Sequence, residues 1–230
     1  MIKLSNIKKN YRTTDIETLA LNNISLEIKQ GEFVAVMGPS GCGKSTLLNV
    51  VGMIDSVNEG EYLFNDQSIS RLKESQMVEM RRNHLGFVFQ SFNLIDDLSV
   101  YENIELPLLY QNVPRSLRKA KIREVLELVG LDARTKHKPG QLSGGQQQRV
   151  AIARAVVTDP KLILADEPTG NLDSKNGDEV MDMLTTLNEQ GTTIMMITHS
   201  AVNAAKAHRI VHMLDGQIAS PSSNTEASAT

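Results

Sequence analysis

The chain carries a glycine-rich loop of the type that holds a phosphate group. Its residues are Gly38, Pro39, Ser40, Gly41, Cys42, Gly43, Lys44, Ser45 and Thr46. An apolar run precedes the loop and an apolar helical pattern follows it, which predicts a strand, a loop and a helix in succession. Glycines let backbone N–H groups turn toward an anion, and the helix presents its positive N-terminal end to the same anion. Lys44 would add a charge at the outer phosphates, and the Ser45 hydroxyl would ligate Mg²⁺, which prefers oxygen ligands. The loop alone predicts a nucleoside triphosphate as the ligand.

Two carboxylates, Asp166 and Glu167, follow a second apolar run at 161–165. In open α/β sheets the carboxyl ends of the strands face the ligand crevice, where the glycine loop also lies. Asp166 is then placed to hold Mg²⁺ through water, and Glu167 to polarise an attacking water. Paired acids often only solvate a strand end, but the apolar strand and the phosphate loop favour chemistry here.

A second phosphate-seeking element lies at Ser143, Gly144, Gly145 and Gln146, directly before an amphipathic helical pattern. A hydroxyl and two glycines before a helix form an anion site of the helix N-terminus kind. One chain thus has two such helix ends but only one Lys-Ser pair for a nucleotide with Mg²⁺.

The elements that must position these residues alternate between strand and helix from residue 33 onward, which predicts an α/β fold with a mainly parallel sheet. We expect strands at 33–37, 85–89, 161–167 and 192–198, and a helix at about 177–190. Alternating residues up to 64 predict a small antiparallel sheet at the N-terminus. The stretch 91–158 lacks strand-like runs and predicts an inserted helical subdomain. We therefore expect one domain over 1–219, with a core at 1–90 and 159–219, and a disordered tail at 220–230.

Composition and charge make several classes of protein unsupported by the sequence. The net charge of −3 and the pI near 6.0 give no reason to expect nucleic acid as a partner. The N-terminus lacks the apolar segment of a secretory signal, and no run is long enough to cross a bilayer. The single cysteine, Cys42, rules out an intrachain disulfide. These features favour a cytoplasmic location.

Together the motifs resemble the ATPase subunit of ABC transporters, from Ile2 to about Ile218. The matching positions are 38–46 for the Walker A loop, Gln90 for the Q-loop, 142–146 for the signature, Asp166 for Walker B, Glu167 for the catalytic carboxylate, 171–173 for the D-loop with Asp173, and His199 for the switch histidine. Tyr11 stands where the family places an aromatic ring against adenine. The resemblance implies the ABC ATPase fold, with ATP and Mg²⁺ as cofactors.

The resemblance also implies a mechanism. Two subunits would close head to tail around two ATP molecules, so that the Ser143 loop of one caps the nucleotide held by Lys44 of the other. Gln90 would contact Mg²⁺ and the attacking water, and His199 would hydrogen-bond the γ-phosphate and support Glu167. Catalysis of this kind consists mostly of positioning and charge stabilisation.

Within the family, the stretches 86–94, 102–107 and 165–173 resemble the branch of macrolide exporters and lipoprotein-releasing systems. This implies an integral membrane permease with few transmembrane helices as partner, and a location on the cytoplasmic face of the inner membrane. The apolar residues Phe92, Leu94, Ile95 and Leu98 either dock that partner or belong to the helical core.

The transported substrate is not encoded in these motifs, and other functions stay open. One alternative is a mechanical regulator of a membrane protein that controls periplasmic cell-wall hydrolases without transport. A soluble ABC ATPase acting on ribosomes or DNA would predict tandem cores, a coiled coil or a basic patch, and the sequence has none of these.

Two positions depart from the family pattern. Cys42 stands where serine is common, and Ser200 follows the switch histidine where the branch often has aspartate. An anion-favouring loop beside Lys44 promotes the thiolate form of a cysteine. We therefore predict that alkylation of Cys42 blocks ATPase activity and that bound ATP slows it, the alternative being an unreactive residue that merely fits.

Overall fold

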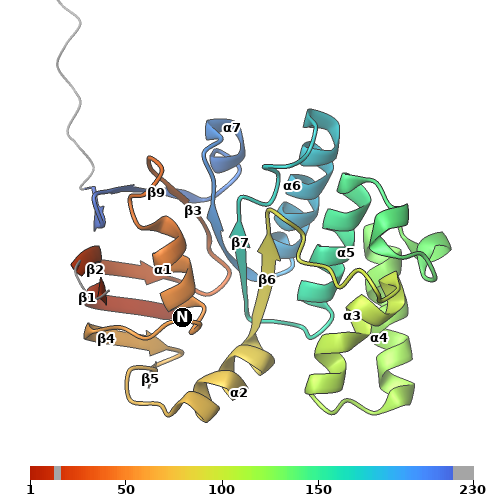
Figure 1. The fold of residues 1–230 in the computed structure, drawn as a ribbon, viewed down its shortest axis with the longest axis horizontal. Helices are drawn as coiled ribbons and strands as arrows, with labels where there is room; N and C mark the ends of the chain where they lie inside the picture. Colours follow the sequence, from red (N-terminus) through yellow and green to blue (C-terminus); the bar gives the residue numbers. More distant parts are fainter. Residues whose placement is uncertain (13–16, 220–230) are drawn as a thin grey trace, which may run out of the picture.

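Two β-sheets pack around one helix in the computed structural model, which describes residues 1–12 and 17–219. The predicted disorder of the tail at 220–230 falls outside these residues. Figure 1 shows the two sheets at the left and centre of the molecule and a lobe of helices at the right. The domain limits expected from the sequence stay a prediction.

The smaller sheet is antiparallel, as predicted, with the strand order β2-β1-β4-β5. Its strands are β1 Ile2–Arg12, β2 Glu17–Ile28, β4 Glu59–Phe64 and β5 Gln67–Ser68. Alternate residues of β1, among them Ile2 and Leu4, are buried against the core. Asn65 and Asp66 join β4 to β5 with φ angles of 48° and 63°. Positive φ at both central residues belongs to the turn that suits a two-residue hairpin.

The larger sheet has the order β10-β9-β3-β8-β7-β6 and is parallel except for β10. Its strands are β3 Phe33–Met37, β6 Leu85–Phe89, β7 Leu162–Asp166, β8 Thr193–Ile197, β9 Arg209–Leu214 and β10 Gln217–Ile218. Successive residues of β3, β7 and β8 alternate between two apolar cores, one on each face of the sheet. A sheet buried on both faces explains the unbroken apolar runs of the sequence.

Strands β9 and β10 were not predicted from the sequence. In β9 only Val211 and Met213 are buried, and they alternate with exposed residues such as Arg209 and His212. The apolar signal is therefore weak, and only pairing with β3 makes β9 part of the sheet.

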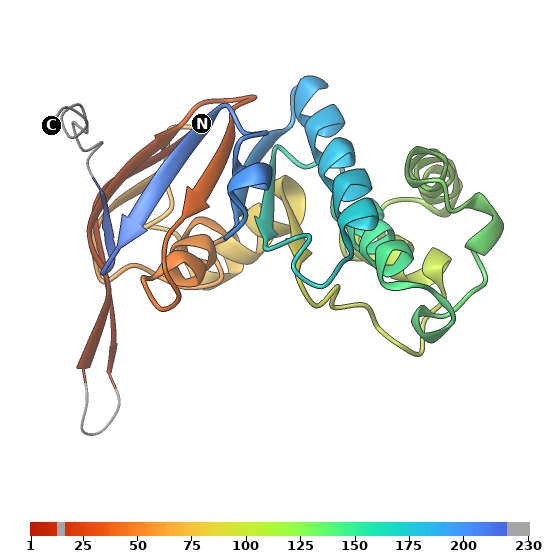
Figure 2. The same ribbon diagram turned by 90° about the horizontal axis from the view of Figure 1, so that it is seen from above.

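Helix α1 lies in the core between the two sheets, and α2 packs against the same core. The helices α3 to α7 contribute to the core on the other face of the parallel sheet (Figures 1 and 2). The helices are α1 Lys44–Val51, α2 Glu74–His84, α3 Val100–Tyr110, α4 Arg115–Val129, α5 Gly144–Val156, α6 Ser174–Glu189 and α7 Ala201–Ala204. Residues 91–158, all of them described, contain helices and turns but no strand, as expected. Among the described helices, none has both the length and the apolarity that crossing a bilayer requires.

The helix expected at about 177–190 begins earlier, at Ser174. Asp173 caps it, because its carboxylate accepts a hydrogen bond from the Asn176 backbone N–H at 2.9 Å. An aspartate directly before a helix is a recognised start signal.

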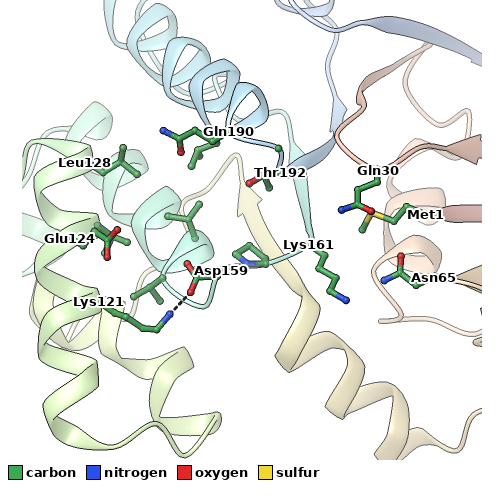
Figure 3. A pocket seen from close by; sticks show the side chains of 16 residues that line it. Met1, Gln30, Asn65, Lys121, Glu124, Leu128, Asp159, Lys161, Gln190 and Thr192 are labelled. Carbon is green, nitrogen blue, oxygen red and sulfur yellow. Dashed lines mark hydrogen bonds and ion pairs between the residues drawn. The ribbon is translucent and has the colours of Figure 1, made fainter.

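A cavity of about 710 Å³ lies between α4 and the edge of the parallel sheet opposite the glycine loop. Figure 3 shows Lys121 of α4 paired with Asp159 on one side, and Met1, Gln30 and Asn65 on the other. None of the residues predicted to bind nucleotide lines it. The cavity is therefore separate from the predicted site.

Candidate functional site

The glycine loop leaves the carboxyl end of β3 and closes around Lys44. The Lys44 side chain is 6% exposed, and its Nζ donates to the backbone oxygens of Gly38 and Pro39, at 2.9 Å each. Gly43 has a φ of 98°, and a Cβ there would lie 2.4 Å from the Ala20 oxygen. Only glycine fits at this point, so the close approach of the loop to β2 depends on it.

Cys42 points into the protein. It is 3% exposed, and its Sγ lies 4.0 Å from Lys44 Nζ. A reagent can therefore reach the thiol only when the loop moves, so the predicted alkylation requires an open loop.

The two acidic residues lie where β7 ends. Asp166 is the last residue of β7, and Glu167 has a φ of 45°, unusual for a residue other than glycine. The Glu167 N–H donates to the Ile197 oxygen at the end of β8, at 3.0 Å. The Glu167 Oε1 lies 2.9 Å from His199 Nε2. The fold thus brings together Asp166, Glu167 and His199.

Electrostatics at this edge favour a bound cation. Burial raises the pKa of Asp166, and the neighbouring charge of Glu167 raises it further, while Lys44 and His199 oppose the shift. A negative charge on Asp166 is therefore poorly compensated by the protein alone, and a cation would compensate it.

The donors at hand suit Mg²⁺. The Ser45 hydroxyl, the Gln90 amide oxygen and the Asp166 carboxylate are hard oxygen ligands. Within the described ranges, no group of three or more His, Cys, Asp or Glu side chains could hold a metal by itself. Mg²⁺ characteristically uses few protein ligands and completes its shell with water and phosphate oxygens. The residues therefore fit a nucleotide with Mg²⁺.

Gln90 follows β6 and is held by the D-loop. Its Nε2 donates to Asn171 Oδ1 at 3.0 Å, and Asn171 Nδ2 donates back to the Gln90 oxygen at 3.1 Å. The Q-loop and the D-loop are thus joined by a reciprocal pair of hydrogen bonds.

The signature loop forms the N-terminus of α5. Ser143 Oγ accepts from the Gln146 N–H at 3.3 Å, and Gln146 Oε1 accepts from the Ser143 N–H at 3.1 Å. This reciprocal capping box uses the Ser143 oxygen as an acceptor, so its hydroxyl hydrogen can be donated to an anion. A Cβ on Gly145 would lie 2.1 Å from Asn176 Oδ1. Since Asn176 Nδ2 donates to the Asp173 carboxylate at 2.7 Å, the signature and the D-loop pack directly together.

The signature and the glycine loop of one chain are not brought together. Helix α1, which begins at Lys44, packs in the core on one face of the parallel sheet, and α5 packs in the core on the other face. Figures 1 and 2 show the two helices on different sides of the sheet. One chain therefore carries the two phosphate-seeking helix ends on separate helices, one on each side of the sheet.

Tyr11, predicted to contact adenine, reaches the start of α1. Its hydroxyl donates to Asp55 Oδ2 at 2.7 Å and also interacts with the Thr46 side chain. Lys9 Nζ donates to Asp55 Oδ1 at 2.5 Å and lies 5.1 Å from the centre of the Tyr11 ring. Tyr11 is 41% exposed, so part of its side chain is accessible to a ligand. No motif pointed to Lys9 or Asp55, because their roles depend on contacts between distant segments.

A glycine loop after β3 and an acidic pair after β7 at the same edge of a parallel sheet define a P-loop nucleoside triphosphatase. Residues 21–170 match the family model described as ABC transporter. The chain belongs to the ABC transporter family, as an ATP-binding ATPase with ATP and Mg²⁺ as cofactors.

Similar proteins agree with this assignment. The chain is 49% identical to an uncharacterised ABC transporter ATP-binding protein of Methanocaldococcus jannaschii, covering 95% of this chain and 97% of the other. It is 46% identical to the macrolide export ATP-binding/permease protein MacB 1/2 of Paracoccus denitrificans, covering 95% of this chain but 33% of that protein. The chain thus spans about a third of that relative's length. The dimeric post-hydrolysis structure of the ATP-binding cassette MJ0796, bound to ADP and Pi, has a TM-score of 0.88 at 44% identity and covers 95% of this chain and 96% of the other.

Proposed function

We propose that the chain hydrolyses ATP as a head-to-tail homodimer and thereby powers a separate membrane permease for export or extraction of a substrate. The observation that carries this proposal is that α1, which begins at Lys44, and α5, which Ser143 caps, pack on opposite faces of one sheet. Neither half-site, the glycine loop or the signature, is complete within a chain, and a second copy supplies what is missing. The similar cassette MJ0796 is described as dimeric, which supports a dimer here.

Each half-site has a separate task in this proposal. Loop amides and Lys44 bind the phosphates, with Tyr11 against the adenine, and Ser143 of the second copy donates to the γ-phosphate. Bound Mg²⁺, held by Ser45, Gln90 and Asp166, would supply positive charge at the phosphate oxygens. Glu167 orients and polarises the attacking water, and His199 holds Glu167 in position. Asp173, at the start of α6, faces the second copy.

The surface that suits the permease is an apolar groove of about 550 Å³ between α2, β6 and α3. Its lining includes Ile54, Val78, Phe87 and Tyr110, of which Tyr110 is 66% exposed. A groove of this kind accepts the apolar face of a helix. Phe92, Leu94, Ile95 and Leu98 were expected either to dock the partner or to belong to the helical core. Leu94 packs against the core, and none of the four lines the groove.

We propose that this groove binds a cytoplasmic helix of a permease with few transmembrane helices, which places the chain on the cytoplasmic face of the inner membrane. The relatives named ATP-binding/permease protein carry both functions in one longer chain, which supports a permease as partner. The substrate class and the alternative of a mechanical regulator depend on the identity of that partner.

The test is affinity capture from detergent-solubilised native membranes with a Glu167→Gln variant, with and without ATP and Mg²⁺. Two substitutions are compared in this Glu167→Gln protein. Tyr110→Asp changes the groove, and Leu117→Asp is the control, because Leu117 lies on α4 outside the groove and is 56% exposed. We expect Glu167→Gln alone and with Leu117→Asp to retain an integral membrane protein, and Tyr110→Asp to abolish its capture. Capture of ribosomal or DNA-bound proteins alone would show that the membrane assignment is wrong.

A further inference from the structure

We infer that Gln148 is a positioning residue that holds the segments carrying Gln90 and Glu167 at a set distance from each other. Gln148 lies on α5 and is fully buried. Its Nε2 donates to the backbone oxygen of Phe89 at 3.2 Å and to that of Pro168 at 2.5 Å. Phe89 directly precedes Gln90, and Pro168 directly follows Glu167. The inference rests on the roles proposed above for these two residues.

The two hydrogen bonds of Gln148 lie just where the backbone pairing of β6 and β7 ends. Strands β6 and β7 are parallel neighbours, paired up to Phe89 and Asp166. Beyond this point the ladder of backbone hydrogen bonds ends, and the two segments must be held by side chains. A carboxamide has two N–H groups and can donate to two acceptors at once. Gln148 therefore continues the cross-link between the strands past their last paired residues.

The same helix begins at the signature loop. Ser143 caps α5, and Gln148 lies on that helix little more than one turn further on. A helix turn is stiff, so a displacement of the signature loop is transmitted to both catalytic segments through one side chain. Contact of Ser143 with the partner's nucleotide would thus be mechanically linked to the placement of Gln90 and Glu167.

The amide of Gln148 is only half satisfied. Its Oε1 has no hydrogen-bond partner in the part of the chain that the structure describes. The reverse amide orientation would turn Oε1 toward two carbonyl oxygens, so the N–H groups must face them. An apolar side chain of the same length would remove the donor to both the Phe89 and Pro168 oxygens. The hydrogen bonds of Gln148 are therefore made only to the two backbone segments that flank the site.

The test compares Gln148→Met, similar in length but without N–H groups, with Asn188→Leu. Asn188 is a matched control: it is 6% exposed, and its Nδ2 donates to the oxygens of Gly31 and Thr192, at 2.9 Å each, away from the predicted catalytic residues. We expect both substitutions to lower the melting temperature. Only Gln148→Met should lower kcat, by about 10- to 100-fold, because small misplacements of reacting groups cost this much. The KM for ATP should stay within about threefold, since the glycine loop is untouched.

A double-mutant cycle separates positioning from a structural role. In a Glu167→Gln background the catalytic carboxylate is already absent, so adding Gln148→Met should lower the residual kcat by less than about threefold. If the kcat losses of Gln148→Met and Glu167→Gln multiply in the double variant, the inference is wrong. Equal kcat values for the Gln148 and Asn188 variants would also overturn it. Full activity of Glu167→Gln alone would instead overturn the proposed catalytic role of Glu167. If Gln148→Met does not fold, Gln148→Asn, which keeps the amide but cannot span both carbonyls, takes its place.

Discussion

His199 Nε2 lies 2.9 Å from Glu167 Oε1, although the two residues follow different strands. Glu167 comes directly after β7, and His199 comes two residues after the end of β8. The two strands are parallel neighbours, with Asp166 paired to Ile197. Carboxyl ends of neighbouring parallel strands meet at one edge, so the register of the sheet sets this contact.

The contact predicts the effect of removing the imidazole. His199→Ala should lower kcat by about 100-fold or more, the usual range for loss of a positioned polar group in a catalytic site. Because the His199 side chain is 44% exposed, the melting temperature should change little. Steady-state ATPase assays and thermal melts test this, with His212→Ala, an exposed histidine on β9, as the control. A His199 variant with wild-type kcat would contradict the predicted role.

The close packing of the signature on the D-loop predicts a strict requirement for glycine at residue 145. A methyl group there would collide with the Asn176 side chain, which is bonded to Asp173. Gly145→Ala should therefore weaken both ATPase activity and ATP-dependent dimerisation, measured by size-exclusion chromatography in a Glu167→Gln background. Gly140→Ala is the control, because a Cβ at Gly140 meets nothing within 4 Å. Equal dimerisation of the two variants would show that this contact is unimportant.

The cluster of Lys9, Tyr11 and Asp55 predicts a pH dependence of the stability of the folded state. Burial works against ionisation of Asp55, but hydrogen bonds from Lys9 and Tyr11 outweigh it and lower its pKa. A lowered pKa means that the cluster stabilises the folded state above the pKa of the unfolded chain, roughly 3.9. This stabilisation is lost as the pH falls through the folded-state pKa.

The comparison that tests this is urea unfolding of wild-type protein and Asp55→Asn between pH 7 and pH 3. The wild-type protein should be the more stable at pH 7, and the difference should shrink toward pH 3. If wild-type protein and Asp55→Asn differ in stability by the same amount at pH 7 and pH 3, the carboxylate charge does not contribute.

Cys42 labelling tests how far the glycine loop opens. With the thiol 3% exposed, N-ethylmaleimide should react slowly, and bound ATP should slow it further by keeping the loop closed. Labelled protein should lose ATPase activity, because the adduct would occupy the space around Lys44. Cys42→Ser, which leaves the chain without a cysteine, controls for labelling elsewhere. Equal labelling rates with and without ATP, or full ATPase activity after labelling, would contradict the prediction.

Much of the fold and the site could be predicted because the evidence lies in short segments. The glycine loop, the acidic pair and the signature each depend on residues next to one another, and the apolar runs around them predict the strands. The antiparallel sheet follows from the alternation of residues in the same way. Strand β9 was not predicted because only Val211 and Met213 among its residues are buried, which leaves a weak apolar signal.

A phosphate loop, an acidic strand end and a second anion-seeking helix can be read from the chain alone, whereas the relationships between distant segments come from folding. The fold places α1 and α5 on opposite faces of one sheet, His199 against Glu167, and Gln148 between the Phe89 and Pro168 carbonyls. These placements depend on the strand order and register of the parallel sheet, which pairs segments far apart in the chain and which local spacing does not encode.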